Sequence, residues 1–178
     1  RWCCWPGGDE RGSGGRATGP KPSITVATIE PTMALVGHTN TIECLAFLPG
    51  GNEIVSSDDD QQLLVWDLVA GQLAYRLAKG DDTGPALALD SSGKLLATAA
   101  DNDLLKLWDV ATKTVAARLK GHHVAFSRTG ALLAAALHEG PIALYDLTTR
   151  QSVGELVGHD TWVYALVFSD DGTTLISG

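Results

Sequence analysis

The stretch GHTNTIECLAFLPGGNEIVSSDDDQQLLVWD, residues 37–67, carries the pattern that decides the fold. It opens on a Gly-His pair and closes on a Trp-Asp pair, and between them short apolar runs alternate with Gly, Pro, Asn and Asp. Short apolar runs bounded by such turn residues are typical of β-strands. The stretch therefore predicts successive strands joined by tight turns.

The same pattern returns along the chain. Gly-His pairs stand at 37–38, 121–122 and 158–159, with a degenerate Gly-Asp pair at 80–81. Trp-Asp closes a strand at 66–67 and 108–109, and Tyr-Asp takes the third place at 145–146. The starts are 43, 41 and 37 residues apart, and a period of about 40–45 residues indicates repeated four-stranded units. Four repeats are predicted, near 37–79, 80–120, 121–157 and 158–178.

One segment has competing preferences. ALLAAALH, residues 131–138, is rich in helix formers, but it occupies the same place in its repeat as EIVSSD and LLATAA. Because those two runs read as strands, this one is also predicted to be a strand.

The repeat resembles the WD-repeat family over about residues 24–178. The resemblance implies an all-β fold, a fragment of a WD-repeat β-propeller with about three and a half four-stranded blades, within 23–178. It also implies a platform for protein complexes rather than an enzyme. A further strand is expected near Ile24–Ile29, and residues 1–22, rich in Gly, Pro and Arg, are predicted to be a disordered lead-in.

The family implies a hydrogen-bond relay in each repeat, in which a His, a Ser or Thr, an Asp and the Trp satisfy one another's buried polar groups. In the first repeat the matching residues are His38, Ser56, Asp60 and Trp66. Later repeats retain only part of this relay, and the members expected to remain are Thr98, Trp108, His122 and His159.

Catalytic and metal sites are not predicted. A His, a Ser and an Asp could suggest a hydrolase triad, but the repeat accounts for all three and no G-x-S-x-G motif is present. The five histidines are spread over the repeats without ligand spacing. We therefore expect no metal, no cofactor and no catalytic residue.

The third repeat and the number of blades depart from the family. Only 5 residues separate Gly121 from Phe126, against 10 from Gly37 to Phe47. The deletion should consume the loop before the first strand, because an odd loss within the strand would reverse its facing; either that blade is distorted or the sequence is aberrant. Closed propellers have about 4–8 blades, so more blades or a partner are expected to close this one.

Composition restricts the partners. The net charge of −8 and pI of about 4.9 disfavour direct nucleic-acid binding, which needs a basic surface. Of three cysteines, Cys3 and Cys4 are adjacent and Cys44 is distant, which is neither a disulfide framework nor a zinc spacing. This indicates an intracellular protein, in cytoplasm or nucleus. No apolar run reaches the ~18 residues that cross a membrane.

The resemblance also places loops on two faces of a propeller. One face would collect carboxylates and the other Lys94, Lys113, Arg128 and Arg150, although the turn preference of Asp is an alternative explanation. The acidic face suggests a protein partner that presents a basic peptide or protein segment. Residues at the start of the innermost strands, two of them aromatic, would also contact the partner on this face. The predicted binding face comprises Thr41, Glu43, Asp58, Asp59, Asp81, Asp82, Asp101, Asp103, Asp160, Trp162 and Tyr164.

Overall fold

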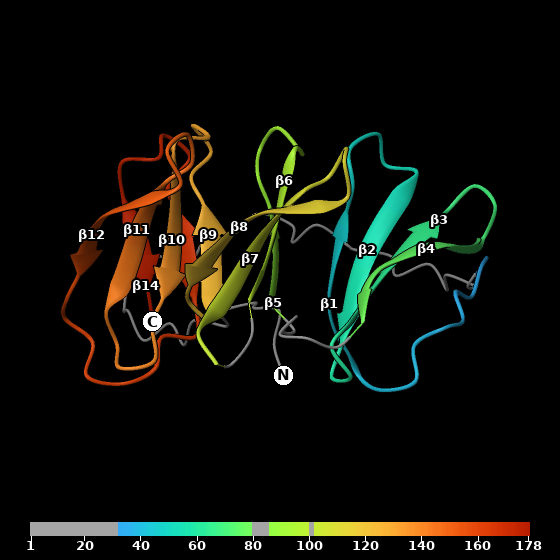
Figure 1. Ribbon diagram of the computed structural model, residues 1–178, viewed down its shortest axis with the longest axis horizontal. Coiled ribbons are helices and arrows are strands. Elements are labelled where there is room, and N and C mark those ends of the chain that lie inside the picture. Colours follow the sequence, from blue (N-terminus) through green and yellow to red (C-terminus); the bar gives the residue numbers. More distant parts are fainter. Residues whose placement is uncertain (1–31, 80–85, 100–101) are drawn as a thin grey trace, which may run out of the picture. The chain divides into compact units, whose positions relative to one another are not determined.

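The computed structural model describes residues 32–79, 86–99 and 102–178. The chain divides into two compact units, Arg1–Ala34 and Leu35–Gly178, and every strand described here belongs to the second (Figure 1). The predicted lead-in at 1–22 and the predicted strand near Ile24–Ile29 lie outside the described residues. No helix in the described residues is long and apolar enough to span a bilayer.

The segment from the first Gly-His pair to the first Trp-Asp pair, residues 37–67, forms three strands of the first sheet. That sheet contains β1 (Ile42–Phe47), β2 (Glu53–Asp58), β3 (Gln62–Asp67) and β4 (Gln72–Lys79), paired antiparallel in the order β1-β2-β3-β4. Gly50 and Gly51 both have positive φ in the turn between β1 and β2, a backbone conformation that glycine adopts without steric cost.

The second and third sheets repeat this order. The second contains β5 (Ala86–Leu89), β6 (Leu95–Ala99), β7 (Leu104–Asp109) and β8 (Thr114–Lys120). The third contains β9 (His123–Phe126), β10 (Leu132–Ala136), β11 (Ile142–Asp146) and β12 (Gln151–Leu156). A last pair, β13 (Leu166–Phe168) and β14 (Leu175–Ser177), begins a fourth. The predicted all-β architecture is confirmed, and so is the Ala-rich strand, which is β10.

Each sheet buries apolar side chains against the next. Leu63 and Val65 of β3 pack with Leu96 and Trp108 of the second sheet. A second cluster joins the second and third sheets, and a third joins β10 and β11 to Val163 before β13. The first strands of successive sheets, β1, β5, β9 and β13, are in contact along the series. The core therefore lies between the sheets, and the loops that precede the first strands are brought close together.

The short third repeat loses its loop rather than a strand. β9 begins at His123, directly after His122, whereas three residues separate His38 from the start of β1. All four residues of β9 pair with β10, from Phe126 opposite Leu133 to His123 opposite Ala136. The deletion consumes the loop, as expected, and the third sheet still has four strands.

Candidate interaction site and the histidine relays

The first sheet contains a continuous relay. His38 Nδ1 lies 2.6 Å from Asp58 Oδ2, and His38 Nε2 lies 2.6 Å from Ser56 Oγ. Ser56 Oγ also accepts a hydrogen bond of 2.7 Å from Trp66 Nε1. Both ring nitrogens of His38 and the indole N–H of Trp66 have partners in this relay, which is the condition for burying such groups without loss of stability. The relay ties the loop before β1 to β2 and β3.

The relay carboxylate is Asp58, so the prediction of Asp60 is wrong. β2 continues through Asp58, which pairs with Ile42 at the start of β1 and is fully buried. Asp60 lies in the turn beyond it and accepts hydrogen bonds of 3.0 Å from Thr39 Oγ1 and Asn40 Nδ2. The placement of Asp58 on an acidic binding face is wrong for the same reason, since no partner can reach a carboxylate that is 0% exposed.

The later sheets keep parts of the relay. Trp108 Nε1 donates to Thr98 Oγ1 at 3.0 Å in the second sheet. In the fourth repeat, His159 Nε2 lies 2.7 Å from Ser177 Oγ. Tyr145, at the place of the tryptophan, donates its hydroxyl to the carbonyl of Lys120 at 3.0 Å. The first contact joins β6 and β7, the second holds the Gly-His segment to β14, and the third joins β11 to the end of β8.

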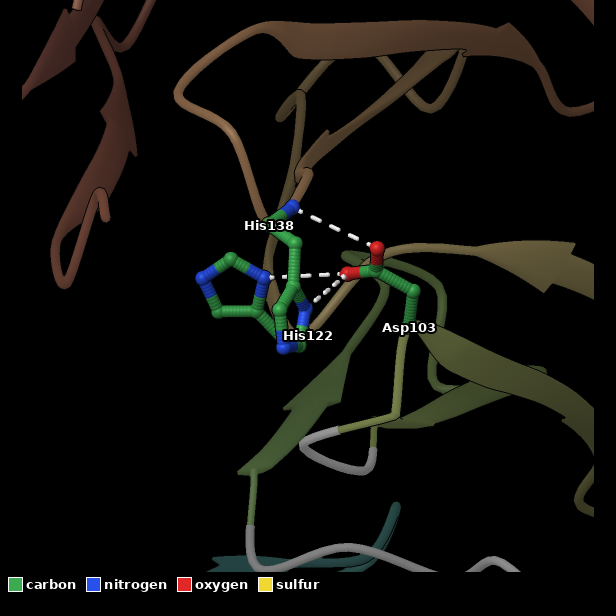
Figure 2. Close-up of side chains that lie close together, drawn as sticks. All are labelled: Asp103, His122 and His138. Atoms are coloured by element: carbon green, nitrogen blue, oxygen red, sulfur yellow. Dashed lines mark hydrogen bonds and ion pairs between the residues drawn. The ribbon is translucent and has the colours of Figure 1, made fainter. Parts of the chain in front are cut away.

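His122 does not contact a hydroxyl of its own sheet but an aspartate of the preceding one. Asp103, in the turn before β7, places Oδ1 at 3.3 Å from His122 Nδ1 and at 3.0 Å from Nδ1 of His138, in the turn after β10 (Figure 2). Asp103 Oδ2 accepts the backbone N–H of His138 at 3.3 Å. Two imidazoles from the third sheet thus converge on one carboxylate of the second.

The contacts determine the charge of Asp103. Burial raises the pKa of this carboxyl, but the side-chain contacts of His138 and His122 and the amide of His138 outweigh burial and hold the pKa below its ordinary value. Asp103 is therefore an anion at neutral pH.

Aromatic rings extend this cluster toward the surface. The Trp162 ring lies 4.6 Å from that of His122 and 4.2 Å from that of His138, between ring centroids. Tyr164 stacks against Trp162 at 6.2 Å and contacts the ring of His123 at 5.8 Å. Tyr164 is 67% exposed, so an aromatic surface is available beside the buried imidazoles.

The other members of the predicted binding face are not part of this cluster as far as the structure describes them. Thr41, Asp59 and Asp160 are exposed, and Glu43 is half-buried. Asp81, Asp82 and Asp101 lie outside the described residues. Of the described members, Asp103, Trp162 and Tyr164 belong to the histidine cluster, and Thr41 and Asp59 are joined separately by a backbone hydrogen bond of 3.1 Å.

Sequence reasoning missed His123 and His138 as members of the cluster. Linear ligand spacing could not reveal them, because the cluster joins two sheets and the start of a fourth repeat. One signal was present: Ala135 stands where Ser56 stands in the first sheet, so His122 lacks its expected partner.

The model of the family described as WD domain, G-beta repeat, matches residues 29–67, 79–109 and 150–178. The chain belongs to the WD-repeat family. The matched segments include the first relay and both Trp-Asp pairs, and they skip residues 110–149, where the shortened repeat lies. The resemblance inferred from the repeat pattern is confirmed.

Several curated relatives match part of this WD-repeat chain. The nuclear distribution protein PAC1 of Gibberella zeae is 36% identical over 106 residues, which are 57% of this chain and 23% of that protein. The small ribosomal subunit protein RACK1y of Oryza sativa subsp. japonica is 32% identical over 94 residues, 52% of this chain and 27% of that protein. The chain thus spans about a quarter of the length of these relatives.

Solved structures show the same fold. The structure of U3-55K matches with a TM-score of 0.67 at 23% identity, and the match covers 74% of this chain and 43% of the U3-55K chain. The RRP9 WD40 repeats have a TM-score of 0.66 at 23% identity, with the same coverage. At this identity the likeness concerns the propeller fold.

Proposed function

We propose that this chain is a non-catalytic scaffold for protein–protein interaction in an intracellular multiprotein complex. Membership of the WD-repeat family supports a platform role. The exposed ring of Tyr164, stacked on Trp162, carries the proposed docking site. Tyrosine and tryptophan are enriched among the residues that dominate binding energy at protein interfaces.

The non-catalytic part of the proposal rests on the first relay. Ser56, His38 and Asp58 have the composition of a hydrolase triad. The Ser56 side chain is buried, however, and its hydroxyl accepts from Trp66 while it contacts His38. A nucleophile must reach a substrate carbonyl, so this serine is placed to hold the sheet together.

The proposed partner is a protein segment rich in Lys or Arg. A guanidinium can stack on the exposed Tyr164 ring through a cation–π contact. The exposed carboxylates of Asp59 and Asp160 would steer such a segment, since complementary charge acts mainly on the association rate. Exposed ion pairs contribute only ~0–1 kcal/mol each, so affinity would come from the aromatic anchors.

The test compares the effect on partner binding of removing an exposed side chain inside the proposed docking site and one outside it. Affinity purification with the wild type, Tyr164→Ala and Val153→Ala identifies partners, and the binding of each purified partner is then measured. Val153 is 59% exposed on β12 and serves as the matched control. We expect Tyr164→Ala alone to weaken binding, by at least about tenfold for a residue worth more than ~1.4 kcal/mol. Equal binding by all three proteins would refute the docking site.

Charge steering has a separate test. Asp160→Lys should lower the association rate with the purified partner and reduce its salt dependence. Asp170→Lys is the control, because Asp170 is exposed and paired with Arg128 at 2.8 Å. If both variants associate at the wild-type rate, the partner is not drawn by this acidic residue.

A second candidate is a scaffold subunit of an RNA-associated complex. The 32% identity with a small ribosomal subunit protein favours it, whereas the net charge of −8 opposes direct contact with phosphates. Salt-dependent retention of RNA by the purified protein would support this alternative.

A further inference from the structure

His122 is a buried histidine whose expected partners have been lost. Its side chain is 1% exposed, and its Nε2 atom has no hydrogen-bond partner among the described residues. In the first sheet Ser56 and Asp58 bind the corresponding histidine, but the third sheet has Ala135 and Leu137 at those places. A buried polar group without a partner costs free energy, so the relay does not explain this histidine.

The contacts that replace the relay at His122 place three side chains as they would lie around a metal ion. Asp103 Oδ1 lies 3.3 Å from His122 Nδ1 and 3.0 Å from His138 Nδ1, with both rings turned to the same oxygen (Figure 2). The angle at His138 Nδ1 is poor for a hydrogen bond to that oxygen. In the absence of a metal ion, the 3.0 Å contact is an ion pair when the imidazole is protonated.

The separations fit a small divalent cation. Bonds of ~2.0–2.1 Å from zinc to imidazole nitrogen or carboxylate oxygen in tetrahedral geometry place neighbouring donor atoms about 3.3 Å apart. The two separations from Asp103 Oδ1, 3.3 and 3.0 Å, are close to that donor–donor distance, and all three donor atoms lie within 4.8 Å of one another. Two imidazoles and one carboxylate are ligands that zinc and related transition ions accept.

Backbone hydrogen bonds hold the three donors in place. The amide of Gly121 donates to the carbonyl of Asp103 at 2.9 Å, and the amide of His122 donates to that of Ala136 at 2.9 Å. Asp103 Oδ2 is oriented by the amide of His138, an outer contact of the kind that fixes a ligating carboxylate. The site is therefore organised before an ion arrives.

The cluster reaches the surface. The side chain of His138 is 40% exposed and that of Asp103 is 27% exposed, while His122 closes the inner side. The Nδ1 atom of His138 is itself buried, so the coordinating atoms face one another rather than solvent.

We propose that Asp103 Oδ1, His122 Nδ1 and His138 Nδ1 bind one divalent transition metal ion, with Zn²⁺ as the representative species. The ion joins the turn before β7 to the loop before β9 and the turn after β10, and so cross-links the second and third sheets where the loop of the third repeat has been lost. This proposal does not rest on the proposed docking of a protein partner, although Trp162 of the docking site packs against both imidazoles.

The first experiment measures Zn²⁺ binding by calorimetry to the untagged full chain. Cys3 and Cys4 are replaced by Ser in every variant, because thiolates bind the same ions. We expect one ion per chain, and a loss of affinity of at least about 10–100-fold in His138→Ala and in Asp103→Asn. His159→Ala is the control, since His159 contacts Ser177 and is not part of the cluster.

A second experiment leaves the ligands intact. Bound Ni²⁺ should quench Trp162, whose ring lies next to both imidazoles, and Trp162→Phe should remove that quenching while Zn²⁺ binding persists. Circular dichroism verifies the fold of each variant, and this readout decides the matter if a ligand variant unfolds. Absence of one-to-one binding, equal affinity in Asp103→Asn, or quenching unchanged by Trp162→Phe would overturn the proposal.

Discussion

The position of one carboxylate decides whether the first relay forms. Asp58 is fully buried and contacts His38 Nδ1 at 2.6 Å, and it also accepts the backbone N–H of Gln62 at 2.9 Å. Asp60, two residues later, is exposed and accepts hydrogen bonds from Thr39 and Asn40 at the surface. The two aspartates are close in sequence, yet their side chains make different contributions to stability.

Asp58→Asn should therefore destabilise the protein, and Asp60→Asn should have little effect. Loss of a charge-assisted hydrogen bond in a buried place costs about 1.5–3 kcal/mol, whereas surface changes are usually within ±0.5 kcal/mol. Urea unfolding followed by circular dichroism gives the midpoints of both variants. Equal midpoints would show that the relay carboxylate has been misassigned.

Residue patterns predicted part of the relay. Ser56 and Trp66 could be identified because their spacing follows from the phase of the repeat. Asp58 could not be separated from Asp59 and Asp60, because three consecutive aspartates leave open where β2 ends. The strand register, with Asp58 opposite Ile42, resolves the choice.

The element that differs most from the repeat pattern is the junction between β8 and β9. The glycine of the Gly-His pair has φ +142° at Gly121, and a Cβ there would lie 2.5 Å from that of Ala135. Gly158, at the same place in the fourth repeat, has nothing within 4 Å of such a Cβ. The chain passes tightly over β10 at Gly121. Close packing of this glycine is not confined to the shortened repeat, since a Cβ at Gly37 would lie 2.8 Å from the Trp66 ring.

Gly121→Ala should consequently destabilise the fold, while Gly158→Ala serves as the matched control. Overpacking of this kind costs typically ~1–3 kcal/mol, with added strain because a side chain rarely adopts this φ. Thermal unfolding of the two variants provides the comparison. A melting temperature of Gly121→Ala equal to that of the control would mean that the junction can relax.

Strand order was predictable from the sequence, and the histidine cluster was not. Short apolar runs with turn residues at regular intervals predict antiparallel strands locally, and they did so even for the Ala-rich β10. The cluster depends on how the turn before β7 meets the turn after β10, which is set by the packing of neighbouring sheets. No local pattern contains that information.

The two outermost sheets of the described unit expose apolar side chains. On β1, Leu45 and Phe47 are 61% and 60% exposed, and on the last pair of strands Val167 and Ile176 are 55% and 63% exposed. The other sheets bury such residues against a neighbour. In a propeller each blade face is covered by the next blade, so these two surfaces have the character of blade interfaces.

The purified chain should therefore self-associate through these surfaces, because contiguous exposed apolar area favours association. Sedimentation velocity over a range of concentrations should show oligomers, and the double substitution Leu45→Lys with Val167→Lys should shift them toward monomer, since a buried unpaired charge opposes contact. Val69→Lys is the control, because Val69 is 78% exposed in the turn after β3 and outside both surfaces. A wild-type chain that stays monomeric and unfolds in one cooperative step would contradict the expectation, and so would a double variant that associates as the wild type does.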